Sequence, residues 1–303
     1  MTTETGAGAR ANCVVDAEGR IALELPTAAL GATAGAAETV GAAETAATAE
    51  TAATAGAAET AARPHLLLRL RPKKGEPVTV RRTVPLEAAG DGPARAVLEP
   101  LPALEEGRWD VFLQAGPDDT APVRLRQGLR DLRALVDGQL RDRPSPVAVR
   151  IPYATKEGYL AVRAWLRTAH AETARVEVGD RSTTVTARLH GATFEDGAVV
   201  RLRMRGSDTP GCDVRPVTDG DRRGFRFTVD HEELAAGTPA EGGVWDVFVH
   251  PAADASPVRV ARLLDDVADR KASFVHPAAR AAGAVLRPYY TLDNDLSIRV
   301  ARG

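Results

Sequence analysis

Arginine is the residue of this chain with the clearest capacity for binding chemistry, and it is dense between positions 124 and 150. The stretch contains Arg124, Arg126, Arg130, Arg133, Arg141, Arg143 and Arg150. A guanidinium binds phosphate through parallel hydrogen bonds, so such a cluster could line a groove for an anionic polymer. Three aspartates in the same stretch favour a solvated face of mixed charge instead. The sequence leaves both interpretations open.

Strand alternation predicts which of these arginines share a face. In Val123-Arg124-Leu125-Arg126, the two arginines point to one side and the two apolar residues to the other. Arg150 follows the apolar Val149 with the same polarity, so it joins that face if the two strands are neighbours. We therefore expect Arg124, Arg126 and Arg150 to be the candidate contacts for an anionic polymer.

Other residue types predict no catalytic, cofactor or metal site. His231-Glu232-Glu233 resembles the start of a zinc-binding helix, but the second histidine is missing because position 235 is Ala. The six histidines have no metal-ligand spacing, and we expect each of them at the surface or at a sheet edge. Asp293-Asn294-Asp295 lacks the Gly and Glu of a calcium loop, so it is interpreted as a turn. Nucleophile and phosphate-loop motifs are also missing from the sequence.

The elements that must position these residues are predicted by a phrase that occurs twice. Trp-Asp-Val-Phe begins at Trp109 and again at Trp245, 136 residues later. The same offset relates Tyr153 to Tyr289, which indicates an internal duplication. A sugar-stacking platform is one role for the tryptophans, but burial between two sheets is favoured because large rings supply much of a core. We expect Trp109, Trp245, Tyr153 and Tyr289 to be structural anchors.

Composition excludes several classes of protein. Among 303 residues, 44% are hydrophobic and 26% are charged, as in ordinary globular proteins. A net charge of −2 gives no electrostatic case for nucleic acid. Cys13 and Cys212 do not form a disulfide framework. No basic start followed by an apolar run and no span of about 20 apolar residues occurs, so we expect no signal peptide, no membrane span and a cytoplasmic location.

Short alternating segments separated by turns predict an all-β protein with two tandem immunoglobulin-like, antiparallel β-sandwich domains. Residues 1–10 are predicted to be a disordered tail, residues 11–165 the first domain and residues 166–303 the second. Residues 31–63 repeat Ala, Thr and Glu with almost no large aliphatic side chain, so they are predicted to be a disordered insertion in the first domain.

Part of each predicted domain resembles a known family. The Trp-Asp-Val-Phe phrase, the apolar-Arg strand after it and the Tyr-x-Thr of the closing hairpin carry the likeness, in residues 109–126 with 149–163 and in 245–262 with 286–299. They resemble the tandem immunoglobulin-like accessory modules of wall teichoic acid glycosyltransferases and of related actinobacterial glycerophosphotransferases. The catalytic domain of that family has no counterpart in this sequence, so no catalytic residue is carried over.

The resemblance implies a non-catalytic binding or assembly module in the synthesis of a teichoic-acid-like cell-envelope polymer or glycan. Its partners would be a glycosyltransferase or polymer synthase, a second copy of the chain, or the anionic polymer itself. The alternative is a transferase, of glycosyl or glycerophosphate type, with an unrecognised active site. The sequence favours the module over the enzyme.

Overall fold

The computed structural model describes residues 8–26, 63–72, 75–87, 92–114, 121–207 and 211–302. The chain forms two compact units, one of residues 1–135 with 152–164 and the other of residues 136–151 with 165–303. The predicted domain boundary between residues 165 and 166 stays a prediction. The predicted insertion lies outside the described residues except for Arg63, as does most of the predicted tail.

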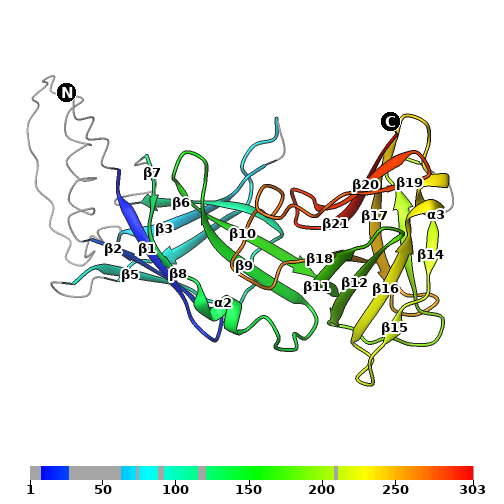
Figure 1. Cartoon of the computed structure of the whole chain (residues 1–303). Helices are drawn as coiled ribbons and strands as arrows, with labels where there is room; N and C mark the ends of the chain where they lie inside the picture. Colours follow the sequence, from blue (N-terminus) through cyan, green and yellow to red (C-terminus); the bar gives the residue numbers. More distant parts are fainter. Residues whose placement is uncertain are drawn as a thin grey trace, which may run out of the picture. The chain divides into compact units, whose positions relative to one another are not determined.

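The first unit contains two sheets (Figure 1). One has the strand order β5-β2-β1-β8 and is made of β1 (Arg10–Val15), β2 (Ile21–Leu25), β5 (Ala94–Leu98) and β8 (Arg126–Asp131). The other has the order β4-β3-β6-β10-β9, with β7 beside β6. Its strands are β3 (His65–Leu70), β4 (Arg81–Pro85), β6 (Gly107–Gln114), β7 (Val123–Arg124), β9 (Val147–Ala154) and β10 (Leu160–Arg167). Residues 147–151 of β9 and 165–167 of β10 are assigned to the second unit. A short helix, α2 (Arg133–Asp137), follows β8.

Alternation along β6 explains how a strand serves both the core and the surface. Trp109, Val111 and Leu113 are at most 2% exposed. Asp110 and Phe112, between them, point to the other face and are half-buried. The same period governs β17 (Gly243–His250) in the second unit, where Trp245, Val247 and Val249 are buried.

In the second unit, two sheets are joined through one strand. β15 (Val217–Thr218), β16 (Gly224–Asp230), β12 (Ser182–His190) and β11 (His170–Val178) follow one another, and β18 (Val258–Ala261) pairs with β11 through Val260 and Ala261. β18 also pairs with β17 through Val258 and Arg259. The remaining strands are β13 (Val199–Met204), β14 (Cys212–Val214), β19 (Ala279–Ala281), β20 (Ala284–Tyr290) and β21 (Leu296–Arg302). Helix α3 (His231–Ala236) follows β16, capped by Asp230.

The all-β, sandwich-like prediction is confirmed. The pairing differs from the prediction in one respect, because not every pair of strands is antiparallel. β1 pairs with β8 in parallel, and β11 pairs with β18 in parallel. Neither described helix is long and apolar enough to cross a membrane.

The β20–β21 hairpin sets the register of the residues discussed below. Arg287 lies opposite Arg299, Tyr289 opposite Ser297 and Val285 opposite Ala301. Directly opposed residues of an antiparallel pair share a face, so these six side chains lie on one side of the hairpin. The turn between the strands contains Asn294 with φ 61°, a left-handed conformation that asparagine tolerates. The interpretation of residues 293–295 as a turn is therefore correct.

Candidate functional site

The two tryptophans predicted as anchors lie inside their units. Trp109 and Trp245 are each 2% exposed. The Trp109 Nε1–H donates to the backbone oxygen of Glu105 (3.0 Å), and the Trp245 Nε1–H donates to Thr238 Oγ1 (2.9 Å). With the ring faces buried and the only polar atom satisfied, neither indole presents a stacking surface to a sugar.

The two tyrosines predicted as anchors are less buried than the tryptophans. Tyr153 and Tyr289 are half-buried, and the Tyr153 hydroxyl finds no hydrogen-bond partner among the described residues. By contrast, the rings of Trp165 and Tyr290 are each 1% exposed. Tyr289 is thereby available to a surface site, since its neighbour Tyr290 occupies the core position.

Arg124 and Arg126, two of the predicted polymer contacts, meet over one ring. Their guanidinium carbons lie 4.4 Å and 4.9 Å from the centre of the Tyr159 ring. Arg124 Nη2 also donates to Asp110 Oδ1 (2.6 Å), so its charge is already compensated. Arg126 Nη1 donates to the backbone oxygen of Glu157 (3.1 Å), which leaves its charge without a carboxylate among the residues that the structure describes.

Arg150, the third predicted contact, differs from the other two. It lies in β9 within residues 136–151, which belong to the second unit, and its side chain is buried, with 9% of the residue exposed. A guanidinium so covered offers little surface to an external ligand. Contact of an anionic polymer with these arginines stays a prediction, and Arg126 suits it best because it is half-buried and has no carboxylate partner among the described residues.

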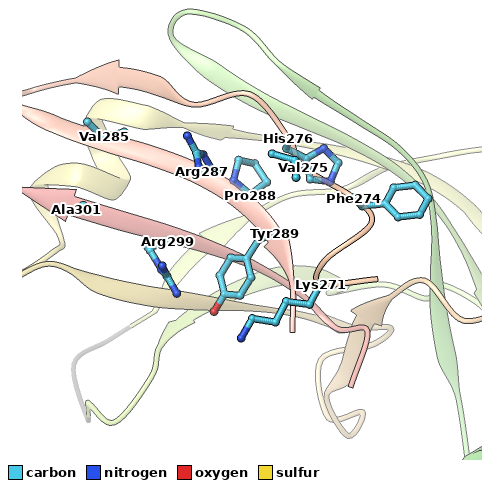
Figure 2. A pocket seen from close by; sticks show the side chains of 10 residues that line it. All are labelled: Lys271, Phe274, Val275, His276, Val285, Arg287, Pro288, Tyr289, Arg299 and Ala301. Atoms are coloured by element: carbon cyan, nitrogen blue, oxygen red, sulfur yellow. The ribbon is translucent and has the colours of Figure 1, made fainter. Parts of the chain in front are cut away.

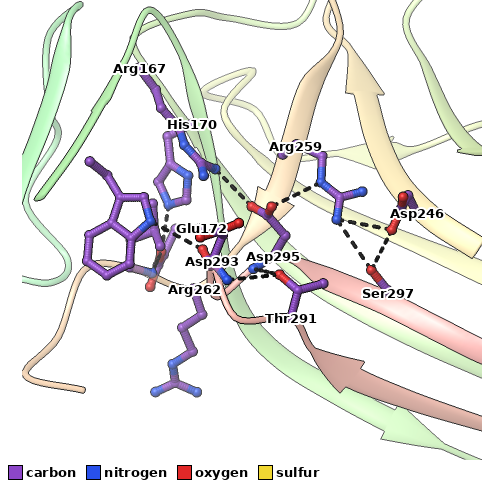
Figure 3. Close-up of polar contacts among 12 residues, drawn as sticks. Arg167, His170, Glu172, Asp246, Arg259, Arg262, Thr291, Asp293, Asp295 and Ser297 are labelled. Atoms are coloured by element: carbon purple, nitrogen blue, oxygen red, sulfur yellow. Dashed lines mark hydrogen bonds and ion pairs between the residues drawn. The ribbon is translucent and has the colours of Figure 1, made fainter. Parts of the chain in front are cut away.

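Asp246 of the second unit is held by several donors, and Figure 3 shows two of them, Arg259 and Ser297. Its Oδ1 accepts hydrogen bonds from Arg205 Nη2 (2.6 Å) and Ser297 Oγ (2.7 Å), and Arg259 Nη2 lies at 3.3 Å. Burial raises the pKa of Asp246, but the hydrogen bonds from Arg205 and Ser297 and the nearby arginine charges outweigh it and lower the pKa. An ionised carboxylate with this many donors cannot serve as a general acid.

Asp110 has the same arrangement in the first unit. Its two oxygens accept from Arg71 Nε (2.9 Å) and Nη2 (2.6 Å), and Arg124 provides a further donor. Phe112 lies under Arg69 at 4.7 Å, as Phe248 lies under Arg259 at 4.8 Å. Each unit thus repeats an aspartate held by two arginines beside an aromatic ring, and the duplication itself stays a prediction.

Three histidines are buried, contrary to the prediction that all six lie at the surface or at an edge. His170, His190 and His231 are at most 1% exposed. Local partners make this possible, since His170 Nε2 contacts Glu172 Oε2 (2.7 Å) and His231 Nε2 contacts Thr183 Oγ1 (2.8 Å). Among the described residues, no three His, Cys, Asp or Glu side chains are grouped to hold a metal ion.

The surface feature best suited to a ligand is a groove beside the β20–β21 hairpin (Figure 2), which we call the hairpin groove. Its volume is about 400 Å³. Its lining comes from β20, from β21 and from the segment before β19, and consists of Lys271, Phe274, Val275, His276, Val285, Arg287, Pro288, Tyr289, Arg299 and Ala301. Three of these residues are cations and none is a carboxylate.

The cations of the hairpin groove lie close together without compensation. Arg287 and Arg299 are exposed and face each other directly across the two strands. Like charges at directly opposed positions destabilise an antiparallel pair. Among the described residues, no carboxylate forms a salt bridge with Lys271, Arg287 or Arg299. This arrangement contrasts with Arg205 and Arg201, which are paired with Asp246 and Asp213 at 2.6 Å.

His276 does not add to this charge at neutral pH. Burial, and then the charge of Arg262, lower the pKa of His276 below its usual 6.5. The positive charge of the groove therefore comes from two arginines and one lysine.

None of the three groove cations is among the ligand contacts predicted from the sequence, and the groove itself was not predicted. The sequence does contain a pattern that predicts the pairing of Arg287 with Arg299. The turn at residues 293–294 and the alternation in Leu286-Arg287-Pro288 and Ile298-Arg299-Val300 place the two arginines opposite each other on the outer face. Lys271 belongs to an irregular segment that carries no comparable pattern.

Comparisons with known proteins give limited information. No family model and no curated protein matches the sequence. Among solved structures, the chain is similar to TarS of S. aureus (16% identity, TM-score 0.36), with 56% of this chain and 32% of that chain covered. For TarS 217–571 the identity is 15% and the TM-score 0.36, with 64% and 44% covered. For a pullulanase of Anoxybacillus sp. LM18-11, complexed with maltotriose, the values are 11% and 0.24, with 79% and 24% covered.

The chain therefore spans less than half of the length of each TarS structure. These identities and TM-scores are too low to assign a function.

Proposed function

We propose that this chain is a non-catalytic binding module and that the hairpin groove of its second unit holds an anionic polymer. The observation that carries the proposal is the set of three exposed cations around the groove, with no carboxylate in its lining. Uncompensated charge of this kind costs stability in the free protein, and an anionic ligand would remove that cost. Guanidinium groups are suited to phosphate because they donate two parallel hydrogen bonds.

A polymer fits this surface better than a single small ion. The cations are distributed over two strands and a neighbouring segment, so they can contact successive anions of an extended chain. The sequence resemblance described above makes a teichoic-acid-like phosphodiester chain the first ligand to test.

A binding module of this kind needs an enzyme to take part in polymer synthesis. We propose a polymer synthase or a glycosyltransferase as that partner, with self-association of the module as the second arrangement. The alternative, a transferase reaction by this chain itself, makes a different prediction. A transferase would change the length or the substitution of the polymer during incubation with its donor, whereas a binding module leaves the polymer unchanged.

The test is a titration of poly(glycerol phosphate) against the full chain at low salt. We expect saturable binding by the wild type and loss of binding by the double variant Arg287→Glu/Arg299→Glu. The control is Arg215→Glu/Arg226→Glu, which makes the same change of net charge at exposed arginines of the second unit outside the groove. Binding that both double variants weaken equally would show a nonspecific charge effect and contradict the proposal.

The predicted contribution of the first unit is tested in the same titration. Arg124→Glu/Arg126→Glu removes the pair of guanidinium groups over Tyr159. A weaker affinity in this variant would add the Tyr159 surface to the binding region, and an unchanged affinity would confine the polymer to the hairpin groove. Wild-type binding should fall as salt rises, because exposed ionic contacts are screened over about 8 Å at physiological ionic strength.

A further inference from the structure

Most of the hairpin groove is apolar, although its charges alone would suffice to hold a polyanion. Phe274, Val275, Val285, Pro288 and Ala301 line it together with the ring of Tyr289. Val275 is 78% exposed, so its side chain is accessible to a ligand in the groove. Small-molecule sites typically combine an apolar lining with a few charged or polar groups that fix orientation. The groove has that composition.

The unpaired edge of β20 is unsuited to a peptide that binds as an added strand. β19 pairs only with Ala284, Val285 and Leu286 of β20, so from Arg287 onward this edge of β20 is not paired with β19. Pro288, two residues after Leu286 in β20, has no backbone N–H to donate. Strand addition depends on a continuous row of main-chain hydrogen bonds, which this edge does not offer.

We infer that the hairpin groove recognises an anionic saccharide, in which a sugar ring lies directly beside the phosphate. The inference rests on the proposed function and specifies its ligand. The C–H face of the ring would pack against Val275 and the Tyr289 side chain, while Arg287 and Arg299 would bind the phosphate. Tyr289 suits this role because its ring is half-buried and already carries Arg299 at 5.3 Å, so that the apolar surface and the cation are adjacent.

The experiment compares two ligands that carry the same phosphate but differ in the ring. Glucose 1-phosphate and glycerol 1-phosphate are titrated into the full chain, and binding is followed by amide chemical shifts in two-dimensional NMR. We expect glucose 1-phosphate to bind at least about tenfold more tightly, with the shifts centred on residues 271–276 and 285–289.

Two exposed apolar residues of the same unit provide a matched pair of variants. Val275→Ser removes the exposed apolar side chain that would contact the sugar ring, and Leu292→Ser makes a similar change in the hairpin turn, where Leu292 is 53% exposed and outside the groove lining. Val275→Ser should abolish the preference for glucose 1-phosphate and keep the weak binding of glycerol 1-phosphate. Leu292→Ser should leave both affinities unchanged.

The outcomes separate this inference from the proposed function. Equal affinity for the two phosphates, or an unchanged preference in Val275→Ser, would overturn ring recognition and leave polyanion binding intact. Preference for an acidic, apolar peptide over glucose 1-phosphate would also overturn it. If neither the two phosphates nor poly(glycerol phosphate) binds, the proposed function fails together with the inference.

Discussion

Trp109 and Trp245 occupy the same position in their respective units, at the start of a strand that forms the core. Replacing either residue by alanine removes a large ring that is 2% exposed. We expect each variant to lose about 3–5 kcal/mol of unfolding free energy, the usual effect of truncating a buried aromatic side chain. Urea denaturation measures this loss. A variant with wild-type stability that no longer binds a glycan would support the sugar platform instead of the core.

His190 should make the second unit sensitive to acid. Burial and the neighbouring charge of His170 lower its pKa from 6.5 to about 4, with smaller effects from Glu172, Arg188 and Arg143. In the unfolded chain His190 is protonated near pH 6.5, whereas in the folded chain it is protonated only near pH 4. The contribution of His190 to the unfolding free energy is therefore fully present above pH 6.5. It is lost as pH decreases toward 4, and the loss is up to about 3 kcal/mol.

A non-titrating variant tests this assignment. His190→Asn keeps an acceptor near the position of Nδ1, which lies 3.4 Å from the Arg143 backbone nitrogen. Its melting temperature should be lower than that of the wild type at pH 7 but should decrease less between pH 6.5 and 5. An equal decrease in the two proteins would assign the acid sensitivity to another group.

Burial of the tryptophans was predictable from the sequence, whereas burial of the histidines was not. Trp109 begins an alternating apolar strand, so the period of the strand itself places the ring in the core. His170 is buried because Glu172, two residues along the same strand, contacts its ring and accepts hydrogen bonds from Leu263 and Leu264. Those two partners lie about ninety residues away in the chain, and no local pattern indicates them.

At the scale of elements, the predicted insertion of residues 31–63 has the least to contribute to stability. It contains almost no large aliphatic side chain, so it has little apolar surface to bury. Deleting Gly35–Ala62 should leave the melting temperature nearly unchanged, because closing a flexible loop costs only about 0.6 kcal/mol for each doubling of its length. Differential scanning calorimetry of the deletion variant tests this. A large decrease in melting temperature would show that the segment packs against the folded core.

The β20–β21 hairpin shows how far an element can be predicted from its sequence. Its turn and its alternation are visible in the sequence, and together they determine that Arg287 lies opposite Arg299. The path of the irregular segment of residues 262–278 could not be predicted, because single contacts hold it in place. Asn294 Oδ1 accepts the backbone N–H of Arg270, and the buried Arg270 side chain donates to the Arg262 oxygen (2.7 Å). Contacts of this kind leave no periodic signal.

At the scale of the whole molecule, residues 136–151 belong with the second unit, although they precede the predicted boundary at residue 165. Gly191 N donates to the Arg143 oxygen (3.0 Å), and Arg188 Nη2 donates to Asp142 (2.8 Å). A fragment of residues 136–303 should therefore melt at a higher temperature than one of residues 166–303. Equal melting temperatures would support the boundary predicted from the sequence.

The proposed function requires that the charges of the hairpin groove serve a ligand at the expense of the stability of the fold. Arg287→Glu tests both parts of this claim at once, because it places opposite charges on directly opposed residues of β20 and β21. Without polymer, the variant should be more stable than the wild type by about 0.2–1 kcal/mol.

The decisive measurement is urea denaturation of the wild type and of Arg287→Glu, each with and without poly(glycerol phosphate). We expect the variant to be the more stable protein without polymer and only the wild type to be stabilised by polymer. A variant that is less stable than the wild type, or that is stabilised equally by the polymer, would contradict the account.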